Sequence, residues 1–227
     1  MMRSLLQLRI VDHSAGFMFT CLKPLEDQFP VAVTSKYTIF RSLGRGACGE
    51  VYQVFERESC QQYAMKVVQK KSFSFPTRNG LCNRVQSEVE ILKKLNHVSF
   101  YICMNHAMTR VEHGELFDRV INLGQLCEDD AKFLFLQIVI ATKYLHDNGI
   151  THRDLKPENI LLSGRSNRCL IKVTDFGLSK FVDGNTMLRT FCGTPTYLAP
   201  EVLRTAGTGT YTSSIDIWSL GVILYVW

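Results

Sequence analysis

The chain has 227 residues, of which 46% are apolar and 21% charged. This composition excludes a disordered tail and a fibrous protein, and it leaves enough apolar material for one sizeable core or two smaller ones. The net charge is +5, from 26 basic and 21 acidic side chains. Because the basic residues form no run, a nucleic-acid-binding arm is not indicated.

The cysteines and the apolar stretches give expectations about the compartment. The eight cysteines lie far apart and form no C-x-x-C pair, which argues against a zinc site or a dense disulfide framework and predicts reduced, intracellular thiols. The amino-terminal segment lacks the features of a secretory signal. The most apolar stretch, 215–227, contains Asp216 and is shorter than the roughly 20 residues of a membrane helix, so no membrane span is expected.

The first part of the chain has the pattern of a small α+β unit. Three β-like runs follow one another between Tyr37 and Val68 (YTIFRSLG, EVYQVFE and QYAMKVV), with turn residues between them. They predict three antiparallel strands. Apolar residues then recur at helical spacing, which predicts a helix over 83–96.

Beyond His113 the pattern becomes mainly helical. Three acidic residues at 128–130 open a long helix with one apolar face, and Asn148-Gly149 ends it. Short strands at 160–162 and 170–173, a Gly/Thr-rich loop at 177–200 and a final helix from about Ser213 complete the expected order.

A glycine-rich turn lies between the first two predicted strands. Gly44, Gly46 and Gly49, followed by Val51, form the pattern G-x-G-x-x-G-x-V. Glycine lets the backbone fold tightly over phosphates and point N–H groups at them, although a plain β-turn cluster has the same composition. A Rossmann-type glycine loop opens a helix, whereas this one joins strands, which disfavours a dinucleotide site.

Lys66 lies on the third predicted strand, where alternation places it on the same face as Ala64 and Val68. A lysine on an inward face indicates an anionic partner, and a solvated edge lysine is the alternative. Glu88, on the following helix, could supply an ion pair, although a surface glutamate is the more common case.

The most specific run is His-Arg-Asp-Leu-Lys-Pro-Glu-Asn at 152–159, followed by Asp-Phe-Gly at 175–177. The side-chain oxygens of Asp154, Asn159 and Asp175 suit one general base and a divalent-metal cage of hard oxygen ligands. A solvated loop would account for any one of them, but not for this order.

With Ala199-Pro200-Glu201 and Asp216-x-Trp218, these motifs resemble those of eukaryotic protein kinases over residues 37–227. The residues within and around these motifs are similar to those of the calcium/calmodulin-dependent group of kinases and, within that group, to those of the checkpoint kinases. The resemblance implies an α+β, bilobal protein-kinase-like fold, with a small β-rich lobe over about 37–112 and a mainly helical, partial lobe over about 113–227. Residues 1–36 are expected to be an extension or linker, too short for a forkhead-associated domain.

The resemblance implies ATP and Mg²⁺ as cofactors and transfer of the γ-phosphate to serine or threonine. Asp154 would orient the substrate hydroxyl and accept its proton, Lys156 would steady the phosphoryl group, and Asn159 and Asp175 would hold Mg²⁺. Lys66, paired with Glu88, would hold the ATP phosphates. The nucleotide-binding residues implied are Leu43, Gly44, Gly46, Gly49, Val51, Ala64 and Lys66.

The same resemblance implies regulation and specificity. Arg153 implies control by activation-loop phosphorylation, at Thr190 first, while Thr194 is expected to be structural first and phosphorylated second. Glu115 and Glu158 match positions that select arginine upstream of the phosphoacceptor. Expected partners are such protein substrates and an activating kinase or self-phosphorylation, with no nucleic acid or membrane. The expected setting is DNA-damage checkpoint or cell-cycle signalling in the nucleus, or alternatively the cytoplasm.

Two regions depart from the family pattern. Residues 98–113 are too short and too polar for two further strands and an adenine-binding hinge, so no hinge residue is assigned. The chain stops at Trp227 inside a predicted helix, so distal helices are expected to be missing. A non-catalytic, truncated kinase-like protein or an incomplete gene model is therefore the alternative to an active kinase.

Overall fold

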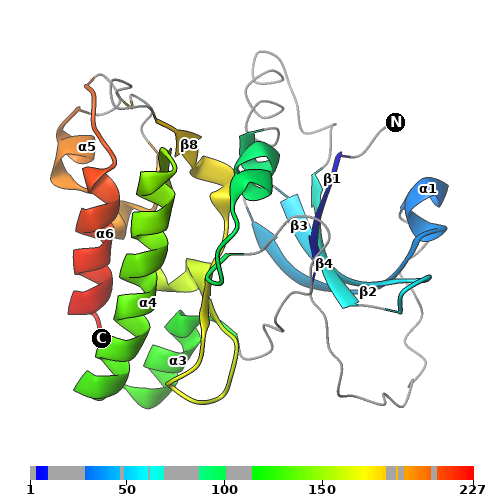
Figure 1. The fold of residues 1–227 in the computed structure, drawn as a ribbon, viewed down its shortest axis with the longest axis horizontal. Coiled ribbons are helices and arrows are strands. Elements are labelled where there is room, and N and C mark those ends of the chain that lie inside the picture. The colour runs from blue at the N-terminus through cyan, green and yellow to red at the C-terminus, as the bar shows by residue number, and fades with distance from the viewer. Residues whose placement is uncertain are drawn as a thin grey trace. The chain divides into compact units, whose positions relative to one another are not determined.

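The computed structural model describes residues 4–9, 29–46, 49–60, 62–68, 87–100, 114–182, 188, 192–205 and 209–227. The chain forms two compact units, Met1–Asn83 with Ile102–Arg110, and Arg84–Tyr101 with Val111–Trp227. The first contains a β-sheet and the second contains the long helices (Figure 1). This division into a β-rich and a mainly helical unit agrees with the fold class that the sequence predicts.

A four-stranded antiparallel sheet in the order β1-β4-β3-β2 forms the first unit. Its strands are β1 (Ser4–Arg9), β2 (Tyr37–Gly46), β3 (Gly49–Glu56) and β4 (Gln62–Val68). The three strands predicted from the sequence are confirmed. The fourth, β1, lies within the predicted extension and pairs with β4 in a register that runs from Ser4↔Val68 to Arg9↔Tyr63.

The core of the first unit lies against one face of this sheet. Ile39, Val54 and Met65 come from three different strands and are fully buried in one cluster. Alternate side chains of a strand point to the same face, so each strand contributes alternate residues to this core. The short helix α1 (Val31–Thr34) adds Val33 to this cluster. The packing fixes the register of β3 against β4, in which Val51 lies opposite Lys66.

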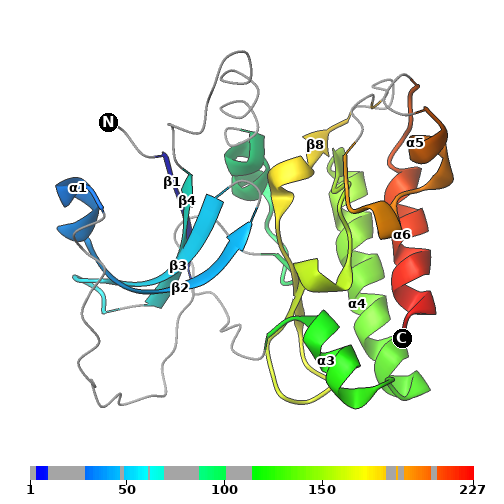
Figure 2. The same cartoon turned by 180° about the vertical axis from the view of Figure 1, so that it is seen from behind.

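The second unit contains α3 (Leu116–Leu123), α4 (Glu128–Asp147), α5 (Pro200–Thr205) and α6 (Ser214–Tyr225), together with a helical segment at 87–94. Helices α4 and α6 run side by side, and the view from behind shows the same (Figures 1 and 2). The predicted long helix is confirmed, as is its end, where Gly149 has a φ of +67°. The predicted helix over 83–96 is confirmed over 87–94, and residues 95 and 96 lie beyond its end.

Short strand pairs and single helical turns connect the long helices. β5 (Ile150–Thr151) pairs with β8 (Lys180–Phe181), and β6 (Ile160–Leu162) pairs with β7 (Ile171–Val173). The turns are η3 (Pro157–Asn159), η4 (Phe176–Leu178) and η5 (Pro195–Tyr197). These pairs set the positions of the loops at 152–159 and 174–179.

Two further sequence-based expectations concern the missing hinge and membrane-spanning helices. Residues 98–100 form a turn and not a strand, while 101–113 lie outside the described residues, so the lack of a hinge stays a prediction. None of the helices in the described ranges is both long and apolar enough to span a membrane.

Candidate active site

The predicted catalytic loop lies between β5 and β6. The Asp154 carboxylate accepts hydrogen bonds from the backbone N–H of Thr194, at 2.8 Å, and from its hydroxyl, at 2.7 Å. The Lys156 ammonium donates to the same hydroxyl at 2.8 Å and lies 3.4 Å from the Asp154 carboxylate. The structure therefore joins the predicted base, the predicted phosphoryl-binding lysine and Thr194 in one cluster. A phosphate on Thr194 would bring negative charge against Asp154 and break these contacts.

Asn159 and Asp175 offer oxygen atoms suited to a divalent cation. The Asn159 amide nitrogen donates to the Asp154 carbonyl, at 2.8 Å, and to its carboxylate, at 3.3 Å, which leaves the amide oxygen as the group able to face a cation. The backbone N–H of Thr174 donates to the Asn159 carbonyl at 2.8 Å, which ties Asp175 to this loop. Within the described ranges, no group of three or more His, Cys, Asp or Glu side chains could hold a metal. One carboxylate and one amide nevertheless fit Mg²⁺, which proteins bind with few ligands beside substrate phosphates.

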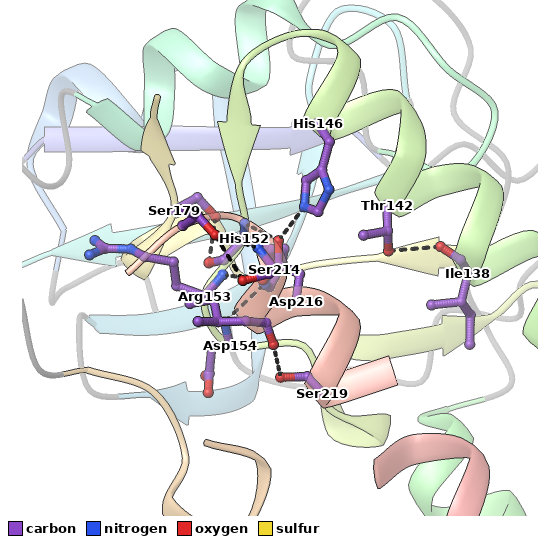
Figure 3. A network of polar contacts seen from close by, with 12 residues as sticks. Ile138, Thr142, His146, His152, Arg153, Asp154, Ser179, Ser214, Asp216 and Ser219 are labelled. Carbon is purple, nitrogen blue, oxygen red and sulfur yellow. Dashed lines mark hydrogen bonds and ion pairs between the residues drawn. The ribbon is translucent and has the colours of Figure 1, made fainter. Parts of the chain in front are cut away.

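A buried carboxylate from α6 lies among the residues of the catalytic loop and supports it (Figure 3). Asp216 is fully buried and accepts hydrogen bonds from the backbone N–H groups of His152 and Arg153, both at 2.9 Å. His146 Nε2 lies 2.8 Å from the same carboxylate. Arg153 has a φ of +69°, a conformation that costs free energy unless its surroundings hold it. Asp216 therefore fixes the backbone immediately before Asp154.

The sequence singles out Asp216 as part of a family signature but gives it no role in the site. A usable signal was present, because Asp216 is an acidic residue within the most apolar stretch of the chain. A carboxylate buried in such a helix must find hydrogen-bond donors. The spacing alone does not show that these donors are backbone groups more than 60 residues earlier.

The Arg153 side chain contacts the residue that follows the Asp-Phe-Gly motif and also contacts Tyr211. Its guanidinium donates to the Leu178 carbonyl at 2.5 Å and to the Tyr211 hydroxyl at 3.4 Å. Gly193 approaches from the activation segment with a φ of +114°, so closely that a Cβ there would lie 2.8 Å from the Arg153 carbonyl oxygen. Thr190, the predicted phosphorylation site, lies outside the described residues.

The predicted nucleotide-binding residues of the first unit lie on β2, β3 and β4. Gly46 pairs with Gly49 at the end of the β2–β3 hairpin, and Gly44 pairs with Val51, while Leu43 on β2 is exposed. Lys66 and Ala64, two residues apart on β4, are both buried. Glu88 is buried on the helical segment of the second unit. The ion pair between Lys66 and Glu88 joins residues of the two units and stays a prediction.

Glu115 and Glu158, the second of which belongs to the catalytic loop, form an acidic pair. Burial raises the pKa of Glu115, and the carboxylates of Asp118 and Glu158 raise it further, against the opposing charge of Lys156. One carboxylate oxygen of Glu158 is buried and has no hydrogen-bond partner in the part of the chain that the structure describes. Burial and Glu158 together also raise the pKa of Tyr197. Excess negative charge in a partly desolvated position is suited to binding a cationic group.

Comparisons with known proteins agree with this site. The family described as protein kinase domain matches residues 37–227. The "Ovarian-specific serine/threonine-protein kinase Lok" of Drosophila melanogaster is 43% identical over a region that covers 92% of this chain and 47% of that protein. The "Myosin light chain kinase A" of Dictyostelium discoideum is 40% identical over 199 residues, or 84% of this chain and 65% of that protein.

A third relative is the "Serine/threonine-protein kinase cds1" of Schizosaccharomyces pombe, 39% identical over 206 residues, which cover 85% of this chain and 44% of that protein. The chain thus spans about half the length of Lok and of cds1. Since the family match covers most of the chain and includes the catalytic loop and the Asp-Phe-Gly motif, the chain belongs to the protein kinase family.

Proposed function

We propose that the chain is a serine/threonine protein kinase that transfers the γ-phosphoryl group of ATP to protein hydroxyl groups. The observation that carries this proposal is the cluster of Asp154, Lys156 and Thr194, in which a carboxylate and an ammonium group lie 3.4 Å apart. These two groups supply the base and the cation that phosphoryl transfer to a hydroxyl needs. The names of Lok and cds1, which both contain "serine/threonine-protein kinase", support the same substrate class.

The proposed reaction uses the cluster in a defined way. The substrate hydroxyl oxygen forms a bond to the γ-phosphorus while the bond from that phosphorus to the bridging oxygen of ADP breaks. Asp154 orients the hydroxyl and accepts its proton, and Lys156 compensates charge on the transferred group. Asn159 and Asp175 would hold Mg²⁺, which neutralises phosphate charge when it is bound. Asp216 keeps the backbone of this loop in place throughout.

Nucleotide binding gives a test that does not depend on catalysis. We expect saturating Mg²⁺-ATP to raise the unfolding midpoint of the wild-type chain, because a ligand at 100 times its Kd stabilises the native state by about 2.7 kcal/mol. Lys66→Met should remove most of this shift. The matched control is Lys36→Met, since Lys36 is an exposed lysine of the same unit. Absence of a shift in the wild-type chain would favour a non-catalytic, kinase-like protein.

For the substrate, we propose a protein segment with arginine three residues before the serine or threonine. Glu115 and Glu158 supply the negative charge. A buried oxygen of Glu158 has no hydrogen-bond partner among the described residues, which supports a bound cation there. We expect Glu158→Gln to lower kcat/KM for an arginine-containing peptide by at least tenfold. For the same peptide with alanine in place of that arginine, kcat/KM should change little. Glu128→Gln, at an exposed position on α4, is the control. An unchanged ratio between the two peptides would refute the assignment.

The preference for arginine should also depend on pH. Because its surroundings raise the pKa of Glu115 above the ordinary glutamate value of 4.5, lowering the pH protonates Glu115 before an ordinary glutamate and should reduce the preference for arginine. In Glu115→Gln, the part of the pH dependence that comes from this carboxyl should disappear. The sign for stability follows from linkage: a carboxyl whose pKa is raised by folding loses stabilising effect as the pH rises from 4.5 through the raised pKa. Urea unfolding of both proteins across this range measures the difference.

We further propose a role like that of checkpoint kinase 2, in nuclear DNA-damage or cell-cycle signalling. Support comes from the 39% identity to cds1 and from the sequence motifs. Activation would follow phosphorylation of Thr190, by an activating kinase or by the chain itself, with Arg153 as the phosphate partner. Phosphopeptide mass spectrometry after incubation with Mg²⁺-ATP tests self-phosphorylation. Imaging of the tagged protein before and after DNA damage tests the location.

A further inference from the structure

Lys172 is a buried cation without a role in the proposed chemistry. It occupies the centre of β7, is 5% exposed, and burial lowers its pKa. Its ammonium group donates hydrogen bonds to the carbonyl oxygens of Val98 and Phe100, the second at 3.3 Å. In the described ranges its contacts are these carbonyls and not a carboxylate. A buried ammonium group is costly, so its placement calls for an explanation.

The turn that Lys172 binds follows the helical segment that carries Glu88. The end of this segment is tied to α4, since the backbone N–H of Asn96 donates to the Tyr144 hydroxyl at 3.0 Å. The N–H of Val173 donates to the Ser99 carbonyl at 2.9 Å. The bond from Val173 and the two bonds from Lys172 attach three successive carbonyl groups, those of residues 98, 99 and 100, to β7.

The same turn also contacts the phenylalanine of the Asp-Phe-Gly motif. The rings of Phe100 and Phe176 meet edge to face with centroids 5.8 Å apart, and Phe176 meets the His152 ring at 5.1 Å. Phe176 directly follows Asp175. Lys172 therefore binds the carbonyl group of Phe100. The Phe100 ring in turn packs against Phe176, the neighbour of the predicted metal ligand Asp175.

We propose that Lys172 is a positioning residue, whose ammonium group clamps the 98–100 turn onto β7 and thereby fixes Phe176 and Asp175 for Mg²⁺-ATP. A lysine suits this position because its ammonium group has three donors and binds two carbonyl oxygens at once, which an apolar side chain cannot do. This inference rests on the proposed kinase function, because it concerns the same site.

Loss of the clamp should affect metal and nucleotide use more than peptide binding. Residues that hold a metal ligand in place change metal affinity or activity by about 10–100-fold when they are replaced. We expect Lys172→Met, which keeps the length of the side chain, to raise the Mg²⁺ concentration for half-maximal activity and the KM for ATP by about this factor. The KM for the peptide should change little. Lys172→Arg retains the donors and should restore both values.

Hydrogen exchange separates this proposal from the proposed function. In Lys172→Met the amides of Phe100, Val173 and Ser179 should exchange faster, because the turn and the η4 turn lose their support, and this readout does not need activity. Lys143→Met, at an exposed position on α4, is the matched control. If Lys172→Met leaves exchange at these amides unchanged, the clamp is refuted whether or not the chain is active. Faster exchange with unaltered Mg²⁺ and ATP dependence in an active chain, or failure of Lys172→Arg to restore them, would reduce Lys172 to a structural residue and overturn the proposal.

Discussion

Asp154→Asn should lower the rate of phosphoryl transfer by about 10²–10⁴-fold, the usual contribution of a positioned general base. Asparagine keeps the shape of the side chain and an oxygen that can accept from Thr194, but it cannot take the proton of the substrate hydroxyl. The measurement is phosphate transfer from labelled ATP to a serine peptide. Stabilisation by Mg²⁺-ATP should persist in the variant, because the change removes a base and not the predicted nucleotide contacts.

The control for this experiment is Asp147→Asn, since Asp147 is exposed at the end of α4 and pairs with Lys143. Its transfer rate should equal that of the wild-type chain. Equal rates in Asp154→Asn and the wild-type chain would remove Asp154 from the chemistry. Loss of both transfer and nucleotide binding in Asp154→Asn would instead indicate that the loop had lost its structure.

Asp216→Ala should destabilise the second unit by roughly 3–5 kcal/mol, the cost of breaking a buried charged network by removing one partner. The change leaves the N–H groups of His152 and Arg153 without their acceptor, and an unsatisfied buried donor costs about 1–3 kcal/mol. It also removes support from the positive φ of Arg153. Urea unfolding measures the loss, and transfer activity should fall with it.

Two further variants make this result specific. Asp216→Asn keeps one oxygen acceptor and should lose less stability than Asp216→Ala. Asp118→Ala, at an exposed position on α3, should change stability by only a few tenths of a kcal/mol, as is usual for surface positions. If Asp216→Ala unfolds at the same urea concentration as Asp118→Ala, the carboxylate does not hold the catalytic loop.

Local pattern was enough to predict most of the secondary structure. The alternation in three runs gave β2, β3 and β4, and the acidic first turn with Asn148-Gly149 gave both ends of α4. The strand β1 was not predicted. It is a six-residue segment that pairs with β4 at the edge of the sheet through backbone groups, and such pairing does not require a particular sequence pattern. Sheet edges accept such strands from distant parts of a chain.

The site was predictable where its residues follow one another in the sequence. The run at 152–159 contains Asp154, Lys156 and Asn159, and the structure places their side chains within one hydrogen-bonded group. The supports came from elsewhere in the chain and were missed. Lys172 occupies a strand with every residue buried, a state that alternation cannot distinguish from a half-exposed strand in so short a segment.

The central claim is that this chain transfers phosphate by means of Asp154. The most direct measurement is incorporation of the γ-phosphate of ATP into a peptide with arginine three residues before a single serine, catalysed by the purified 227-residue chain. We expect incorporation that requires Mg²⁺, stops on chelation and falls by about 10²–10⁴-fold in Asp154→Asn. The claim would be contradicted if the wild-type chain incorporated no more phosphate than Asp154→Asn while its unfolding curve showed that it was folded.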